Sequence, residues 1–381
     1  MAAPSGLPPA FPSPTGIEGV ANPLIDRRRF VQAAGIAFLA GLSPRALHAL
    51  ERADAVFASA FRAKDGSYGV ATVTERGEIV SRSPLPARAH GMAACPATAK
   101  AVAFARRPGT FAMVLDLAGG ADPVVIAAPD GRHYFGHGCF SPDGRWLYAS
   151  ENDFDANRGV IGLYDARENF ARIGEYEAFG IGTHDLSVSD DGAMLIAANG
   201  GIETHPDFGR TKLNLDRMEP SLALIDARDG ALIERHILPE TLRQLSTRHI
   251  DLDAAGQIWF ACQYEGPRND RPPLVGRFSK GEPLAFLDLP EETVRTLGNY
   301  VGAIAVNRRL GLVGVTSPVG GAAVTIDAAS GRVIESRNRP DAAGIAAAPE
   351  GFAVSSYDGR MQETQSDVAW DQHILRLSGH G

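Results

Sequence analysis

Hydrophobic and polar residues alternate with a period of two along most of the chain after residue 50. This period is typical of β-strands with one buried face, whereas an amphipathic helix repeats every 3.6 residues. A strand, a tight polar turn and a second strand recur, most clearly in SPDGRWLYAS at 141–150 and SDDGAMLIAAN at 189–199. Looser copies of this unit occur at 95–105, 253–262, 306–317 and 348–356. The pattern predicts an all-β protein made of repeated units.

Each unit continues with a third strand, a hairpin turn and a fourth strand, as in LALIDARDGALIERHIL at 222–238. Spacings of about 40 to 50 residues with loop insertions are typical of propeller blades. The three N-terminal strands lack the first strand of their unit, and the segment HILRL at 373–377 supplies it. We therefore predict a seven-bladed β-propeller, with six or eight blades as alternatives, closed by strands from both chain ends in one blade. The remaining blades are expected to begin near His90, His137, His184, His249, Tyr300 and Ala343.

Five histidines occupy one position of the repeat, the start of the first strand of a blade: His90, His137, His184, His249 and His373. A closed ring brings this position back to one axis, and imidazole is a common ligand of zinc, copper and iron. The sequence thus predicts a site for iron, copper, zinc or a haem. The alternative is a structural role, in which each ring hydrogen-bonds to nearby backbone, as the Gly-His pair does in WD-type blades.

The histidines do not stand at one constant distance from the following turn. His90 lies five residues before Cys95, whereas His137 lies four residues before Ser141. Because a one-residue shift moves a side chain to the other face of a strand, this difference predicts that only some of the five rings face the axis.

The long loops between second and third strands are expected on the same face as the histidines, where loops often carry binding residues. Their acidic residues and one further histidine are candidates to support the site: Glu151, Asp153, Asp155, Asp185, Glu203, His205, Asp207 and Glu265. Residues 151–155 have the spacing of a calcium loop but lack its glycine and distant glutamate, so a solvated acidic turn is the simpler interpretation.

Residues 1–50 do not follow the strand pattern. Three arginines and a phenylalanine at 27–30 precede the apolar stretch AAGIAFLAGL at 33–42, which together indicate a twin-arginine signal peptide. We expect 1–50 to be a cleaved, disordered leader, 51–377 a single propeller domain and 378–381 a tail. This organisation predicts a periplasmic protein without a membrane span after cleavage, since no apolar run is long enough to cross a bilayer.

The charge and cysteine content exclude some kinds of partner and of covalent cross-link. The net charge of −8 argues against nucleic acid, because phosphate binding needs a basic surface. The three cysteines, an odd number, form no complete disulfide framework and are expected to be buried thiols.

Several segments are similar to a family of twin-arginine-exported bacterial propellers of unknown function, most specifically THPDFGR at 204–210 and LNLDRMEPS at 213–221. The resemblance covers most of residues 50–377. Members of that family lie beside imelysin-type periplasmic iron proteins, which implies a part in iron acquisition and supplies no catalytic residue. The histidine-bearing ring also resembles that of nitrous oxide reductases, whose propeller carries a copper cluster on histidines.

Three functions are compatible with these features. The first is a periplasmic binding protein for iron acquisition that holds a metal ion, a metal complex or a haem-like ligand on its histidine- and acid-rich face. The second is a scaffold for imelysin-type or other iron-uptake partners, with structural histidines. The third is a metal-dependent enzyme of lactonase or oxidoreductase type. We favour binding over turnover, because the sequence contains no recognisable nucleophile–base motif.

Overall fold

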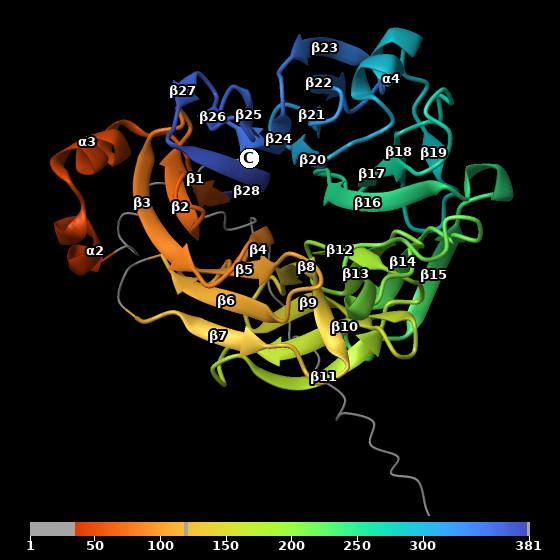
Figure 1. The fold of residues 1–381 in the computed structure, drawn as a ribbon, viewed down its shortest axis with the longest axis horizontal. Coiled ribbons are helices and arrows are strands. Elements are labelled where there is room, and N and C mark those ends of the chain that lie inside the picture. The colour runs from red at the N-terminus through yellow and green to blue at the C-terminus, as the bar shows by residue number, and fades with distance from the viewer. Residues whose placement is uncertain (1–34, 118–120, 379–381) are drawn as a thin grey trace, which may run out of the picture.

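The computed structural model describes residues 35–117 and 121–378, and its strands form seven four-stranded antiparallel sheets. The sheets are arranged as blades around a central axis, with the first strand of each blade innermost (Figure 1). The prediction of an all-β, seven-bladed propeller is therefore confirmed.

The first three blades take up the N-terminal half of the fold. Blade 1 contains β28 (Val368–Ser378), β1 (Val56–Ala63), β2 (Tyr68–Thr74) and β3 (Ile79–Leu85). Blade 2 contains β4 (Ala89–Ala94), β5 (Lys100–Ala105), β6 (Phe111–Asp116) and β7 (Val124–Ala127). Blade 3 contains β8 (Arg132–Phe140), β9 (Trp146–Asp153), β10 (Arg158–Asp165) and β11 (Ala171–Glu177).

Four further blades complete the ring. Blade 4 contains β12 (Thr183–Val188), β13 (Met194–Asn199), β14 (Ser221–Asp226) and β15 (Leu232–Ile237). Blade 5 contains β16 (Leu245–Leu252), β17 (Ile258–Tyr264), β18 (Val275–Phe278) and β19 (Ala285–Phe286). Blade 6 contains β20 (Ala303–Asn307), β21 (Leu312–Ser317), β22 (Ala322–Asp327) and β23 (Val333–Asn338). Blade 7 contains β24 (Ala342–Ala348), β25 (Gly351–Ser356), β26 (Arg360–Met361) and β27 (Thr364–Gln365).

Strand β28 closes the ring. It pairs antiparallel with β1, placing Phe57 opposite Arg376 and Phe61 opposite Trp370, so the last strand of the chain is the innermost strand of blade 1. In Figure 1 it lies at the centre of the disc, beside β4 and β24. This arrangement confirms the closure expected from the segment at 373–377, and it leaves no open end in the ring of blades.

The turns between first and second strands follow directly from their sequence. In the turn after β8, the hydroxyl of Ser141 donates to Asp143 at 2.5 Å and accepts from the backbone N–H of Trp146 at 2.9 Å. Gly144 has a φ of 69°, which a residue with a side chain adopts only at a cost. The turn after β12 has the same design, with Ser189, Asp191 and Gly192. These turns fix the register of the paired strands.

The core lies between neighbouring blades. The middle strands are buried on both faces, and Trp259 and Phe260 of β17 are fully buried in an apolar cluster shared by blades 4, 5 and 6. Cys95 and Cys262 are buried free thiols as expected, and the third thiol, Cys139, is only half-buried.

Short helices complete the described chain. They are α2 (Gly35–Gly41), α3 (Pro44–Arg52), the 3-10 turns η1 (Pro206–Phe208) and η2 (Glu240–Leu242), and α4 (Glu291–Leu297). The side chain of Ser43 caps α3, which lies beside β3 (Figure 1), and Leu50 belongs to the same apolar cluster as Val80 and Leu85 of that strand. The expectation of a disordered 1–50 thus differs from the structure after residue 34, because α3 buries apolar side chains on blade 1. The arginines at 27–29 lie outside the described residues.

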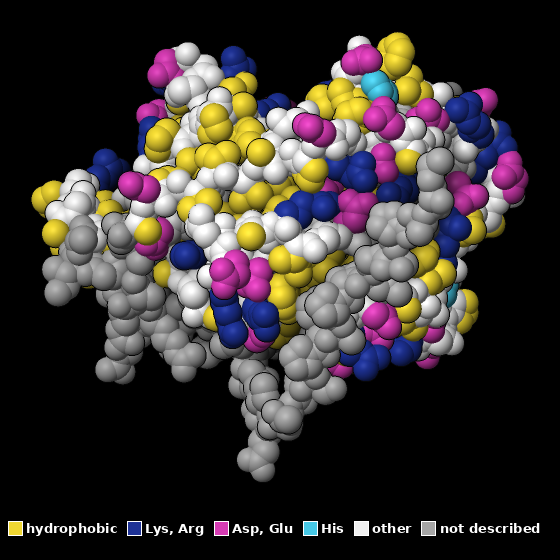
Figure 2. Space-filling model, turned by 90° about the horizontal axis from the view of Figure 1, so that it is seen from below, with side chains coloured by type: hydrophobic (Ala, Val, Ile, Leu, Met, Phe, Trp, Pro, Cys, Tyr) yellow, Lys and Arg dark blue, Asp and Glu magenta, His cyan; other side chains and the backbone are white. Residues whose placement is uncertain are grey.

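The rim of the disc carries charges of both signs. Seen from the side of β7 and β11, Lys and Arg side chains lie next to Asp and Glu side chains, with hydrophobic patches between them (Figure 2). Among residues 35–117 and 121–378, no helix is both long and apolar enough to cross a bilayer.

Candidate metal centre at the axis

The structure brings the five histidines of the repeat together at the axis. Eight of their ring pairs have centroids between 4.6 and 5.6 Å apart. His137 is central, since its ring lies 4.6 to 5.4 Å from each of the other four rings. The imidazoles therefore form one compact cluster, which we call the histidine cluster.

Bulges in the inner strands explain why all five rings reach the axis. The pairing of β4, β8, β12, β16 and β28 with the neighbouring strand shifts register at or next to the histidine in every case. For example, Thr183 pairs with Asn199 and Asp185 with Ala198, so His184 is an extra residue between them. Because a bulge re-aims side chains, it cancels the one-residue difference that the sequence shows. The prediction that only some of the rings face the axis is wrong for this reason.

Glycines allow the rings to approach one another. A Cβ atom on Gly91 would lie 2.5 Å from the carbonyl oxygen of Gly136 and 2.7 Å from Nδ1 of His137. A Cβ atom on Gly136, whose φ is 107°, would lie 2.9 Å from Cδ2 of His90. Any larger residue at 91 or 136 would separate His90 from His137.

The cluster is buried, and its nitrogens are incompletely satisfied. His90, His137, His184 and His249 are 2 to 7% exposed, and His373 is half-buried. Within residues 35–117 and 121–378, the Nε2 atoms of His137, His184, His249 and His373 are buried without a hydrogen-bond partner, and so are Nδ1 of His90 and Nδ1 of His249. Leaving a buried polar atom unpaired costs about 1–3 kcal/mol, so such a group indicates a bound ligand or another functional reason.

Asp185 lies beside two of these rings and orients one of them. Its Oδ1 lies 3.2 Å from Nδ1 of His137, whereas its Oδ2 lies 3.8 Å from Nδ1 of His249, which is too long for a hydrogen bond. The same carboxylate accepts hydrogen bonds from the backbone N–H groups of Leu186 and Ile250. Burial alone would raise the pKa of Asp185, but His137 and His249 hold it well below its usual range. The carboxylate keeps the proton of His137 on Nδ1 and so leaves the lone pair on Nε2, as around many metal sites.

His184 has the opposite arrangement. A guanidinium nitrogen of Arg248 lies 3.2 Å from its Nδ1, and because arginine only donates, Nδ1 must accept. The proton of neutral His184 is thereby assigned to Nε2, which removes the lone pair that a metal would need. The charge of Arg248 also opposes a cation at this end of the cluster.

Burial keeps the rings neutral. Burial and neighbouring positive groups lower the pKa of His249 to about 4 and hold the pKa values of His90, His184 and His373 well below their ordinary 6.5. Neutral imidazole is the form that binds metals, so His249 and His373 have no proton to lose before an ion enters near pH 7.

Two groups of three histidines offer ring nitrogens within 4.8 Å of one another: His90, His137 and His184, and His137, His249 and His373. The second group, which we call the metal triad, has three unpartnered Nε2 atoms and a carboxylate behind two of its rings. The first group contains His184, whose tautomer and arginine neighbour disfavour a cation. The triad is therefore the better metal site.

The cluster lies between two openings of the pore. A channel of about 480 Å³ on the face of the short turns is lined by the three triad histidines, Asp185 and mostly apolar side chains such as Ile304 and Ile345. A pocket of about 170 Å³ on the face of the long loops is lined by His90 and His184. An ion bound to the triad is thus accessible from the turn face.

Cys139 also lines the turn-face channel, but it packs against the apolar cluster around Tyr148, and burial raises the pKa of its thiol. It belongs to neither group of potential ligands.

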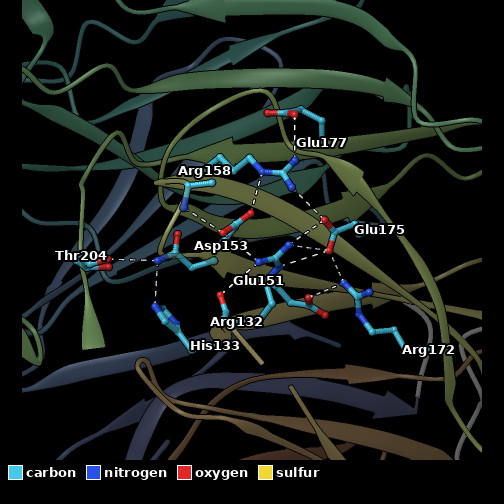
Figure 3. Close-up of polar contacts among 12 residues, drawn as sticks. Arg132, His133, Glu151, Asp153, Arg158, Arg172, Glu175, Glu177 and Thr204 are labelled. Carbon is cyan, nitrogen blue, oxygen red and sulfur yellow. Dashed lines mark hydrogen bonds and ion pairs between the residues drawn. The ribbon is translucent and has the colours of Figure 1, made fainter. Parts of the chain in front are cut away.

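Two of the expected supporting acids belong to an ion-pair network within blade 3 (Figure 3). The fully buried Glu151 pairs with Arg172 at 3.0 Å and accepts a hydrogen bond from Tyr164 at 2.6 Å. Asp153 pairs with Arg132 and Arg158, each at 3.0 Å. Neither acid lines the pore openings described above, so both have a structural role.

The other supporting candidates are spread over the loop face. Asp155 is exposed, Glu203 pairs with the exposed Arg217 at 3.1 Å, and His205 accepts from the backbone N–H of Asp207 at 3.2 Å to cap η1. Glu265 pairs with Lys212 and lies 3.8 Å from Arg248. Of the eight candidates, Asp185 is the one that pairs directly with the histidine cluster.

Sequence reasoning missed the charged neighbours of the cluster. Asp371 accepts from Nε of Arg88 at 2.6 Å and lies 3.8 Å from Nδ1 of His90. Asp371 and Arg248 both sit in a bulge, one or two residues before a cluster histidine. Their positions next to a cluster histidine in the sequence could have identified them as neighbours of the cluster. Arg106, Arg107, Arg210 and Lys212 reach the loop-face pocket from connections between strands, which no local pattern indicates.

Residues 83–377 match a family described as protein of unknown function (DUF1513). No curated protein matches the sequence of this chain. Among solved structures, Kuenenia stuttgartiensis hydrazine synthase is similar with a TM-score of 0.58 and 13% identity, covering 78% of this chain and 91% of that one. The β-propeller domain of Myceliophteria thermophila Cps50 (Swd1) is similar with a TM-score of 0.55 and 12% identity, covering 84% and 96%. At these identities the similarity extends to the fold alone.

Proposed function

The chain belongs to the DUF1513 family of proteins of unknown function, and from that premise we propose that it binds a transition-metal ion through His137, His249 and His373. The observation that carries the proposal is the state of the triad. Three buried Nε2 atoms lack hydrogen-bond partners among the described residues, the three rings offer nitrogens within 4.8 Å of one another, and Asp185 lies beside two of the rings. An ion would accept all three lone pairs and remove the cost of leaving them unpaired.

The donor set indicates the kind of metal. Imidazole nitrogens suit zinc, copper, iron and nickel, whereas calcium and magnesium prefer oxygen ligands. Three histidines with an open side toward the turn-face channel leave room for water or an exchanging ligand on the ion.

The packing of the cluster favours a bare ion over a haem-like ligand. Ring centroids only 4.6 to 5.6 Å apart leave no space between the imidazoles for a planar macrocycle. A single ion needs a gap of only about 4 Å between opposing nitrogens, since metal–nitrogen bonds are about 2.0–2.1 Å long.

The proposed setting is the periplasm, after twin-arginine export, with a role in iron acquisition beside imelysin-type partners. The support is the arginine motif at 27–30 and the resemblance of the 204–210 and 213–221 segments. Fractionation of cells that express the full chain tests the export step. The control is a variant in which Arg28 and Arg29, the pair before Phe30, are replaced by lysine. A cytoplasmic full-length protein in both cases contradicts it.

Elemental analysis tests the metal site. Protein purified without chelators should contain close to one equivalent of iron, copper, zinc or nickel per chain, and His137→Asn should lose it. His236→Asn, a partly buried histidine that pairs with Glu234 on the outer strand β15, is the matched control and should keep the metal.

A metal-free wild type that gains no thermal stability from any of these ions would overturn the proposal. An ion at 100 times its dissociation constant must stabilise the folded state by about 2.7 kcal/mol. In that case the histidines hold the blades together and the scaffold function becomes the better explanation.

A further inference from the structure

The loop-face opening of the pore is strongly basic. Its walls carry five cationic side chains, together with the neutral donors Gln263, Tyr300 and Gln372 and the rings of His90, His184 and Phe135. We call it the arginine pocket and define it by its cations: Arg106, Arg107, Arg210, Lys212 and Arg248. These cations come from blades 2, 4 and 5, so the fold itself gathers them from distant parts of the sequence.

The positive charge of the pocket is not balanced. Among the described residues that line it there is no carboxylate, although the whole chain has a net charge of −8. Glu265 pairs with Lys212 and lies 3.8 Å from Arg248, and Asp371, next to the lining residue Gln372, pairs with Arg88. Neither carboxylate forms an ion pair with Arg106, Arg107 or Arg210.

Most of the guanidinium groups lack partners. Arg107 is 8% exposed and, among the described residues, makes no hydrogen bond or ion pair through its side chain; its guanidinium carbon lies 5.8 Å from the ring centroid of Phe135. The Nε atoms of Arg106 and Arg248 are buried and unpaired. The side chain of Arg210 makes no hydrogen bond or ion pair with any residue in 35–117 or 121–378.

The cations lie close enough to repel one another. Burial, followed by the nearby charges of Arg248, Arg210 and Arg106, lowers the pKa of Arg107 to about 9. Burial followed by Arg106 and Arg248 also lowers the pKa of Arg210. Arginines are normally protonated at any accessible pH, so side chains crowded in this way are stable only at a cost that a bound anion would remove.

We propose that the arginine pocket binds a small anion with two or more negative charges on carboxylate or phosphate oxygens. Guanidinium groups match such oxygens with paired hydrogen bonds, which a lysine cannot provide. The pocket of about 170 Å³ admits only a small molecule. This site is separate from the metal triad, because it opens on the other face of the disc and touches His90 and His184 instead.

Neutral groups complete the recognition surface. Gln372 donates from its Nε2 to the hydroxyl of Tyr300 and to the carbonyl oxygen of Gly302, both at 3.2 Å. These contacts hold the phenol at the wall of the pocket, and its O–H is left to donate to an anion. The Nε2–H of His184, assigned by the hydrogen bond from Arg248, is a second donor at the base.

Calorimetric titration of metal-free protein at low salt tests the proposal. Citrate and inorganic phosphate are titrated separately, to distinguish carboxylate from phosphate ligands, and acetate serves as the singly charged comparison. One of the two polyanions should bind, and Arg107→Gln and Arg210→Gln should each weaken it by about ten- to a hundredfold. Arg217→Gln, in the same 200–220 connection but paired with Glu203, is the control and should bind like the wild type.

Two results would overturn the proposal. One is the absence of binding by either polyanion to both metal-free and metal-loaded protein. The other is binding that Arg107→Gln and Arg210→Gln leave unchanged. Arg210 lies in the connection between β13 and β14 and belongs to none of the apolar clusters, so its variant should fold even if the buried Arg107 variant does not. Elemental analysis of the same samples reports on the metal triad separately, so either site can fail without the other.

Discussion

Asp185 lies 3.2 Å from Nδ1 of His137 and also accepts the backbone N–H of Ile250 in the next blade. One carboxylate thus joins two blades and orients a ring of the histidine cluster. Asp251 occupies the corresponding place in blade 5, where it accepts the backbone N–H of Val306 at 2.7 Å but pairs with no cluster histidine. Variants of the two aspartates can therefore distinguish a structural role of this contact from a role at the proposed metal site.

Replacing Asp185 with Asn should weaken metal binding by about 10- to 100-fold, because the amide no longer holds the proton on Nδ1 of His137. Asp251→Asn, the matched control, should bind metal as the wild type does. Competition titrations against a chromophoric chelator measure both affinities. Equal losses in the two variants would mean that Asp185 acts only by joining blades.

The choice between the two histidine groups is open to a direct comparison. His249→Asn removes a triad ligand and should abolish stoichiometric metal binding, whereas His184→Asn removes a ring whose Nδ1 is taken by Arg248 and should retain it. Metal content after dialysis checks both. Loss of metal in the His184 variant alone would mean that the ion binds to the other group, His90, His137 and His184.

Acid should destabilise the metal-free protein between pH 6.5 and about 4. The pKa of His249 is lowered from 6.5 to about 4 in the folded state, and those of His90, His184 and His373 are lowered too. The unfolded chain therefore binds protons first, so stability is complete above pH 6.5 and falls as the pH drops toward 4. Each such histidine contributes about 1.4 kcal/mol per pH unit.

Urea unfolding at several pH values measures this slope. His249→Gln should flatten it, and His48→Gln, on the exposed face of α3, should leave it unchanged. A metal-free protein equally stable at pH 7 and pH 5 would contradict the burial of neutral rings.

Gly91→Ala should disturb the cluster without touching a ligand. The added Cβ would meet the carbonyl oxygen of Gly136 at 2.5 Å and His137 at 2.7 Å. Overpacking of this kind costs about 1–3 kcal/mol, and the displaced ring should bind metal more weakly. Gly174→Ala is the control, since its Cβ meets no atom within 4 Å. Thermal melts and chelator competition measure the two effects.

Glu151→Gln should reduce stability but spare the metal. It would break the pair with the half-buried Arg172, which keeps Glu175 at 2.7 Å as a charged partner, so the loss should stay below the roughly 3–5 kcal/mol of a fully buried pair. Glu219→Gln, which loses an exposed pair with Arg235, should change stability by less than about 1 kcal/mol. Metal affinity equal to the wild type in both variants would confirm that blade 3 holds a structural network; a specific loss in Glu151→Gln would argue otherwise.

Much of the fold was readable from the sequence, because alternation and turn chemistry are local. The Ser-x-Asp-Gly turns at 141–144 and 189–192 mark their strands directly, and the closing role of 373–377 followed from a missing strand in blade 1. The bulges were not readable, because an extra residue is visible only once both paired strands are known. Counting residues from His90 and His137 to the next turn therefore gave a wrong expectation about which rings face the axis.

The surroundings of the site were harder to foresee than its histidines. Glu151 and Asp153 look like ligands in a linear sequence, yet the arginines that neutralise them come from β8, β10 and β11. Arg107 and Arg210 meet only because blades 2 and 4 turn their loops toward the same axis. Pairings between distant segments depend on the closed ring, and no local pattern encodes them.

One histidine of the triad comes from the strand that closes the ring. His373 lies on β28, which is held at the axis by its pairing with β1. A nascent or truncated polypeptide would therefore present two of the three imidazoles and retain an ion poorly. Tight metal binding would then require the closed ring, so a molecule that retains the ion would be one in which β28 has paired with β1.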